Sequence, residues 1–519
     1  MRLQSMRVPR MSFQDDKALR KALRLAPPRA SERIVGVIRA QQSLLRSAAP
    51  AILAALALAY APALRAQGPN PTSAANPFFG SVTARPVSDE KLKLSLDEAI
   101  ALGLKNNLGL KEAENNEKSL QGQKNGALQN FLPTVTLTGD LGVHQQSLVA
   151  MGFGPDTVKE FSKLFTIPSN FSFITRDDLT EGKIQFGQML FSGPVISAWK
   201  AAGAAERAAH FARMSARDEV VQQVATAYLH AIAASSEVDN ARAQVATGEV
   251  LVHHAHEAHA AGVVANLDEL RARVQLQAEQ QALIAAQYAL EKELILLKRE
   301  IGIDPGQKIA LTDPAPYSDL AAQTPEEVCA IAYKNRQDYQ TLQNQVVEVK
   351  AIHAAYRSQR LPSLSFGGYY GVSQVSGAGS HGNFVAQGTL SFPLFREAKL
   401  RGDTQVAQAQ LDAVYAQLAD LRTRIDQQIR TALLDVNATA KLVEVARSNV
   451  DLATRALADE TDRVNAGVDD NLPLVTAQAT LASAESNLVE SLYRYNLAKL
   501  ALARAAGIIE SQYRDYLGR

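Results

Sequence analysis

The stretch that decides the fold is LPTVTL at Leu132–Leu137, because it returns as LPSLSF at Leu361–Phe366. In each copy a Leu-Pro pair is followed by apolar residues that alternate with small polar ones. A second motif, Ala-Gly-Val, begins at Ala261 and returns at Ala466. Spacings of 229 and 205 residues are too long for a solenoid unit, so they indicate a duplicated half-protein. We expect the two halves to lie side by side, because one half cannot bury its own faces.

Both copies open with the same helix-start signal. Ser95 is followed three residues later by Glu98, and Thr324 by Glu327, which predicts a capping box in each copy. The spacing between the copies changes only between residues 139 and 191. The first copy therefore carries an insertion of roughly two dozen residues there, between two predicted strands, where an exposed loop tolerates extra residues.

Composition favours long helices and excludes several classes of function. Only 6% of the 519 residues are aromatic, and the net charge is +1, which gives no electrostatic reason to expect nucleic acid as a partner. The single cysteine, Cys329, corresponds to the apolar Ile100 of the first copy. We interpret it as a packing residue rather than a catalytic thiol, because no His and Asn/Asp signature accompanies it.

The N-terminus predicts an export signal behind a charged extension, together spanning 1–66. Residues 1–46 are rich in Arg and Lys, and 47–64 are apolar. Small residues follow at Ala61, Ala63 and Ala66, which predicts cleavage near 63–67. The alternative is an uncleaved membrane anchor, but the apolar run is short for a spanning helix and contains two prolines. Residues 67–94 are predicted to be a Pro- and Ser-rich linker.

Four segments show the period-two alternation of a β-strand with one apolar and one polar face. They lie at about 135–143, 180–191, 364–373 and 383–394. Each is about ten residues long, a length that crosses a bilayer obliquely. The alternative is a soluble sheet of two hairpins packed on helices.

Long helices occupy most of the remaining chain, so the fold class is mixed but mostly α. We expect helices at 95–131, 195–260 and 267–301, and again at 324–360, 398–465 and 472–506. The longest have apolar residues at coiled-coil spacing, and each should end at a glycine. The last two helices of each copy should form a helical hairpin, turning at Gly262 and at Gly467.

Open sheet edges cannot lie in lipid, and four strands cannot close a barrel, since small closed barrels start at about eight strands. A membrane barrel would therefore be shared between chains. Two chains would supply eight strands, and three would supply twelve.

In these features the chain resembles the TolC family of outer-membrane efflux channels, over about residues 92–508. The resemblance is carried by the Leu-Pro strand entries, by LFSGP at Leu190–Pro194, by SFPLF at Ser391–Phe395, and by the two hairpin turns. It implies the domain boundaries 95–303 for the first repeat, 304–323 for a linker, 324–508 for the second repeat and 509–519 for a C-terminal tail.

The resemblance also implies a homotrimer with a 12-stranded transmembrane β-barrel in outer-membrane lipid and an α-helical tunnel that extends into the periplasm. Such a protein is not an enzyme and has no cofactor. It is the passive exit duct of a tripartite efflux or type I secretion system, joined to an inner-membrane pump by a periplasmic adaptor (membrane fusion) protein. Drug, protein and metal cargo are all consistent with a hydrated lumen, and of these we favour small-molecule cargo. The alternative is a soluble periplasmic coiled-coil scaffold protein.

The periplasmic aperture of this family lies at the hairpin tips. Asp268 matches an acidic position of the first tip, but the corresponding positions of the second tip are Pro473 and Thr476. The position of a basic partner is Asp469, so the family's salt-bridge gate is not expected. Asp469 and Asp470 would instead favour cations at the mouth, or would be ordinary solvated turn residues. Apolar packing at the aperture is expected from Leu267, Leu472, Leu474 and Val475.

The residues just before the first hairpin turn read HHAHEAH, at His253–His259. His256 and His259 fall on one helix face. The spacing is not HExxH, so a zinc protease is unsupported. A metal-binding mouth and a polar helix face are both consistent with the pattern. We favour the polar face and predict no metal site, because the corresponding stretch Ala458–Val464 contains no histidine.

Overall fold

The computed structural model describes residues 75–83, 85–164, 166, 171–262, 265–314, 316–375, 379–466 and 471–518. Residues 71–519 form one compact unit. The extension and signal peptide expected at 1–66 lie outside the described residues. From residue 75, the expected linker packs against the helices, since Val82 donates a backbone hydrogen bond to Asn106 and Arg85 donates one to Gly302.

The described chain is mostly helical. The helices are η1 (Pro77–Phe79), α3 (Leu96–Asn106), α4 (Leu108–Leu128), η2 (Gln129–Phe131), α5 (Pro155–Phe161), α6 (Gly193–Ala260), α7 (Asn266–Ile301), α8 (Pro325–Asn335), α9 (Gln337–Ser358), α10 (Glu397–Asn465), α11 (Asn471–Ala505) and α12 (Ile509–Leu517). The strands are β1 (Leu92–Leu94), β2 (Thr134–Ser147), β3 (Ile174–Phe191), β4 (Ile309–Leu311), β5 (Ser363–Val375) and β6 (His381–Ser391).

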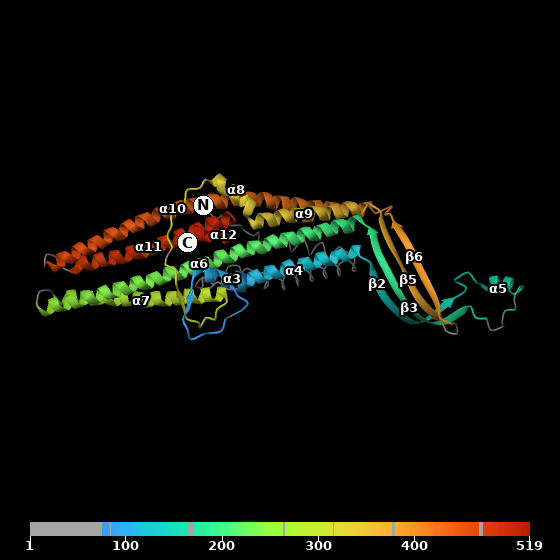
Figure 1. Cartoon of the computed structure of the whole chain (residues 1–519), viewed down its shortest axis with the longest axis horizontal. Helices are drawn as coiled ribbons and strands as arrows, with labels where there is room; N and C mark the ends of the chain where they lie inside the picture. Colours follow the sequence, from blue (N-terminus) through green and yellow to red (C-terminus); the bar gives the residue numbers. More distant parts are fainter. Residues whose placement is uncertain are drawn as a thin grey trace, which may run out of the picture. The chain divides into compact units, whose positions relative to one another are not determined.

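Two long helical hairpins, α6–α7 and α10–α11, run beside the shorter helices α4 and α9 (Figure 1). Helix α6 packs against α4, α7, α9 and α11, so helices of the two sequence copies contact one another. The core lies where these helices meet and contains Tyr228, whose hydroxyl donates to the backbone oxygen of Leu94 over 2.9 Å. No helix among the described residues is both long and apolar enough to cross a membrane.

The prediction of one continuous helix at 95–131 and another at 324–360 is wrong, because each helix breaks near its first third. Asn107 and Arg336 adopt extended backbone conformations, with ψ of 133° and 120°. Each break faces a left-handed glycine at the end of the following hairpin, Gly302 or Gly507. A Cβ added at Gly507 would lie 2.7 Å from the backbone nitrogen of Arg336, and one at Gly302 would lie 2.8 Å from the Cβ of Asn106. The chain therefore bends where another segment approaches closely.

The membrane-strand candidates form one antiparallel sheet in the order β2-β3-β5-β6. The expected length of about ten residues fits β6, with 11, but is wrong for β3, with 18. Strands β2 and β3 stay paired as far as Ser147 and Ile174, beyond the end of the apolar alternation, because backbone pairing does not require an apolar face. The insertion of the first copy joins these two strands and contains α5. The short parallel pair β1–β4 was not predicted.

The register places most of the exposed large apolar side chains of the four strands on one face, because directly paired residues of antiparallel strands share a face. Leu137 pairs with Ile184, which pairs with Tyr370, which pairs with Phe384. Leu137 is 80% exposed. The same face also presents exposed Val135, Leu141, Val143, Val372 and Leu390. The other face is mainly polar and carries Thr138, Lys183 and Asn383, together with Tyr369 and Val385.

Candidate functional site

The hairpin tips lie at the ends of the long helices that are remote from the sheet (Figure 1). Helix α6 starts two residues after β3 and has 68 residues, so its tip lies about 100 Å from its start. At the first tip Gly262 has φ of 73°, a left-handed conformation that terminates α6 as predicted. Gly467, the predicted turn of the second tip, lies outside the described residues.

The predicted aperture residues occupy different environments. Leu267 is exposed and Leu474 is buried. Asp268 is largely buried and pairs with Arg271 on its own helix, with 3.3 Å between Oδ1 and Nη1. Leu472 lies in α11, but its side chain is not among the described residues, and Asp469 and Asp470 lie outside them.

A shallow cavity of about 380 Å³ joins the two tips. Leu267, Asp268, Leu270 and Val274 of α7 line it together with Val475 of α11. The structure therefore brings Leu267 and Asp268 close to the second hairpin, and the cavity offers both an apolar wall and one carboxylate.

Glu269, which sequence reasoning missed, is the most highly connected charged group of the first tip. Its carboxylate lies 3.1 Å from Nδ1 of His256 and 2.9 Å from Nδ1 of His259, and it also accepts a hydrogen bond from Arg273. The hydrogen bond with His256 is the main reason why the pKa of Glu269 lies below its ordinary value. The sequence contained one signal that could have revealed this contact: Glu269 lies just across the turn from two histidines that share one helix face.

The histidine-rich stretch does not form a metal centre in the part of the chain that the structure describes. No group of three or more His, Cys, Asp or Glu side chains there is arranged to hold a metal ion. His253 pairs instead with Glu257, one turn further along α6, over 3.3 Å. His256 and His259 do more than cover a polar helix face, because they connect α6 to α7 through Glu269.

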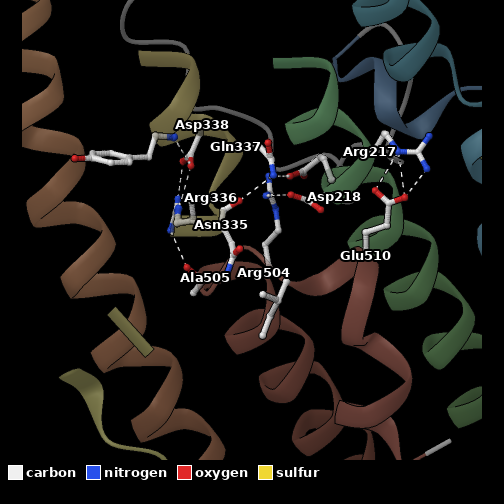
Figure 2. A network of polar contacts seen from close by, with 12 residues as sticks. Arg217, Asp218, Asn335, Arg336, Gln337, Asp338, Arg504, Ala505 and Glu510 are labelled. Atoms are coloured by element: carbon white, nitrogen blue, oxygen red, sulfur yellow. Dashed lines mark hydrogen bonds and ion pairs between the residues drawn. The ribbon is translucent and has the colours of Figure 1, made fainter. Parts of the chain in front are cut away.

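A second polar cluster, also missed by sequence reasoning, lies where the helix break at Arg336 meets the end of α11 (Figure 2). Arg336 donates to Asp338 over 2.6 Å and to the backbone oxygen of Ala505 over 3.3 Å. Arg504 lies 3.5 Å from Asp218 of α6. Burial raises the pKa of Asp218 to about 6.

The C-terminal residues take part in this cluster. The segment expected as a tail forms α12, and its Glu510 accepts hydrogen bonds from Arg217 of α6, at 3.0 Å from Nε (Figure 2). The cluster therefore ties helices of the first copy to helices of the second and to the C-terminus. Its side chains form hydrogen bonds and ion pairs with one another, which is typical of a structural network.

The polar face of the sheet carries a charged group of its own. Lys183 lies 2.7 Å from Glu181 and 3.9 Å from Asp140, and its ammonium lies over the ring of Tyr369. These side chains give the polar face a hydrated, charged character, in contrast to the apolar face behind it.

The chain thus joins a small antiparallel sheet, which has one mainly apolar exposed face, to two long helical hairpins. Residues 99–302 and 330–508 match the family described as outer membrane efflux protein, and the chain belongs to this family. The resemblance to the TolC family is thus confirmed, and family membership supports a role as an efflux channel. No curated protein matches the chain.

Solved structures of the same fold cover most of the chain. A membrane protein from Pseudomonas aeruginosa is 20% identical, with a TM-score of 0.67 over 79% of this chain and 93% of that one. The Campylobacter jejuni CmeC outer membrane channel is 16% identical, with a TM-score of 0.64 over 81% and 89% of the two chains. The open state of the Neisseria gonorrhoeae MtrE outer membrane channel is 18% identical, with a TM-score of 0.65 over 83% and 95%. At these identities the likeness shows the fold.

Proposed function

We propose that this protein is the outer-membrane exit duct of a tripartite efflux or type I secretion system and passively conducts substrates from an inner-membrane pump. The sheet carries this proposal. Most of its exposed large apolar side chains share one face, charged and polar side chains predominate on the other, and β2 and β6 each leave one edge unpaired within the described sheet. Unpaired edges cannot lie in lipid, so the edges must pair with other copies.

Three copies are the assembly that fits a duct. Three times four strands give a twelve-stranded barrel, which is wide enough for a channel, whereas eight strands would be filled by side chains. In this homotrimer the apolar face contacts outer-membrane lipid and the polar face, with Lys183 and Glu181, lines a wet lumen. The helices extend into the periplasm, where an adaptor protein joins their tips to the pump. The duct performs no catalysis and needs no cofactor.

The periplasmic aperture in this proposal is the ring of hairpin tips. Leu267, Leu472 and Leu474 close it by apolar packing, while Asp268, Asp469 and Asp470 give it a preference for cations. The domain boundaries remain those expected from the sequence: a signal peptide within 1–66, repeats at 95–303 and 324–508, and connecting segments between and around them.

Charge placed on one face of the sheet or on the other tests the proposal. Leu137→Arg puts a cation on the apolar face, which costs about 2–4 kcal/mol near the middle of a bilayer. Thr136→Arg, the preceding residue of the same strand, puts the cation on the polar face opposite the neutral Gln185 and is the matched control. We expect the first change to reduce the amount of trimer recovered from outer membranes and the second to leave it intact.

Fractionation and bilayer recording provide the readout. We expect a heat-modifiable trimer in the outer membrane that conducts ions in planar bilayers. Recovery of the wild-type protein as a soluble periplasmic monomer, or equal tolerance of both arginines, would contradict the proposal and favour the soluble scaffold.

A further inference from the structure

The two hairpin tips are held by different chemistry, although they occupy corresponding places in the duplicated sequence. With the offset of 205 residues that relates the hairpins, Glu269 corresponds to Leu474. Both side chains are buried, with 6% and 4% of their surface exposed. The second tip therefore buries an apolar group at the position where the first tip buries a carboxylate.

The side chains that bind Glu269 at the first tip are also replaced at the second tip. His256 and His259, the imidazole partners of Glu269, correspond to Thr461 and Val464 of the second copy. Neither of these residues titrates. Arg273, the third partner of Glu269, corresponds to Gln478, which is fully buried. The contact between ionisable side chains at the first tip therefore has no counterpart at the corresponding positions of the second tip.

The geometry of the first tip links its two helices directly. The imidazoles come from the last two turns of α6, and Glu269 lies in the first turn of α7. Each imidazole Nδ1 contacts a different carboxylate oxygen, at 3.1 Å and 2.9 Å. Both imidazoles are partly exposed, so they exchange protons with solvent while they remain in contact with the buried carboxylate.

The charged groups around this contact are few. Arg273 binds the same carboxylate. Glu249 and His253 of α6 line a cavity that also borders His256 and Arg273, and Glu257 pairs with His253. Within the described residues, no charged group of α10 or α11 forms an ion pair with Glu269 or with either imidazole.

We propose that His256, His259 and Glu269 form a pH-sensitive tie that holds the first hairpin tip more tightly in mildly acidic than in alkaline conditions, while the second tip does not respond. A hydrogen bond between two ionised groups is stronger than one in which the imidazole is neutral. Histidine gains its charge below about pH 6.5. The extra stability is therefore present in mild acid and is lost as the imidazoles deprotonate.

At low pH the stabilisation is limited by protonation of Glu269. Its folded-state pKa is lowered from 4.5, so this contribution is lost as pH falls through that lowered value. The tie is strongest between these two transitions. The inference rests on the hairpin alone and holds independently of the proposed export function.

Hydrogen exchange of the full-length protein, followed by mass spectrometry, tests the tie. Peptides from 252–262 and 266–276 report on the first tip, and peptides from 455–465 and 473–483 report on the second. After correction for the intrinsic pH dependence of exchange, we expect protection of the first tip to fall about three- to tenfold between about pH 5.5 and pH 8. Protection of the second tip should not change with pH.

Three variants separate the tie from general effects. The double change His256→Gln and His259→Gln should abolish the pH dependence of the first tip. Glu269→Leu introduces the residue found at the corresponding position of the second tip. In this variant the first tip should stay protected from hydrogen exchange, and its protection should not depend on pH. His253→Gln is the control and should keep the wild-type response, because the ion pair of His253 among the described residues is with Glu257 and not with Glu269.

Equal pH dependence of both tips in the wild-type protein would overturn the proposal, and so would a response that survives in the double variant. The comparison of the two tips within one wild-type molecule remains decisive even if a variant fails to assemble.

Discussion

Glu300 offers the sharpest test of the electrostatics of this fold. It lies in the last turn of α7 with 4% of its surface exposed. One carboxylate oxygen accepts a hydrogen bond from Gln223 over 3.2 Å, and the other has no hydrogen-bond partner in the part of the chain that the structure describes. Burial, which disfavours the charged form, raises its pKa from 4.5 to about 8. We predict that Glu300→Gln stabilises the protein at alkaline pH and changes little at acidic pH.

The size and sign of this effect on the free energy of unfolding follow from the difference in the pKa of Glu300 between the folded and unfolded states. A folded-state pKa above the unfolded value means that the folded state holds the proton more tightly, so stability is highest below pH 4.5 and falls until about pH 8. The full loss is roughly 5 kcal/mol per chain. Glutamine is neutral throughout and avoids this loss. In acid it is close to the protonated carboxyl group, which leaves one O–H donor without a partner where the amide leaves two N–H donors.

Thermal unfolding of the purified protein in detergent, followed by circular dichroism, measures the effect. Wild type and variant are compared at about pH 5, 7 and 8.5 and at one protein concentration, because the midpoint of an oligomer depends on concentration. Glu291→Gln changes an exposed carboxylate of the same helix and is the control. If wild type and Glu300→Gln keep a constant difference in midpoint across this range, Glu300 is already ionised and the reasoning is refuted.

Three further predictions follow from single contacts. Burial raises the pKa of Asp218 from 3.8 to about 6, so the free energy of unfolding falls by about 3 kcal/mol as pH rises across this range. Asp218→Asn removes this cost, so the variant should melt no lower than wild type at neutral pH and should lack that pH dependence. Leu474→Ala should weaken the second tip by about 2–5 kcal/mol, seen as faster hydrogen exchange there. Gly507→Ala should lower the melting temperature at a cost above about 1 kcal/mol, because φ is 71° and the new Cβ would meet Arg336. Gly402→Ala, in a helix with open space around it, should raise the melting temperature, and the reverse order of the two glycine variants would contradict the argument.

The sequence by itself determined the features that depend on neighbours along the chain. The capping boxes at Ser95 and Thr324 are present, because the side chain and the backbone groups that form them lie within one turn. The left-handed ends at Gly262, Gly302 and Gly507 were predictable for the same reason. The alternation in the strands predicted which side chains share the exposed apolar face, since strand periodicity is local.

Tertiary structure alone decided the features that depend on residues far apart in the chain. The helix break at Arg336 exists where Gly507 packs against its backbone, a contact that no local pattern records. The pairing of Glu269 with His256 and His259 depends on how the two helices of the hairpin align across the turn. The place of α12 depends on the burial of Ile509, Tyr513 and Leu517 in the core, with the ion pair between Glu510 and Arg217 beside them. Helix propensity and periodicity describe one segment at a time, whereas each of these features is stabilised by the close approach of two segments.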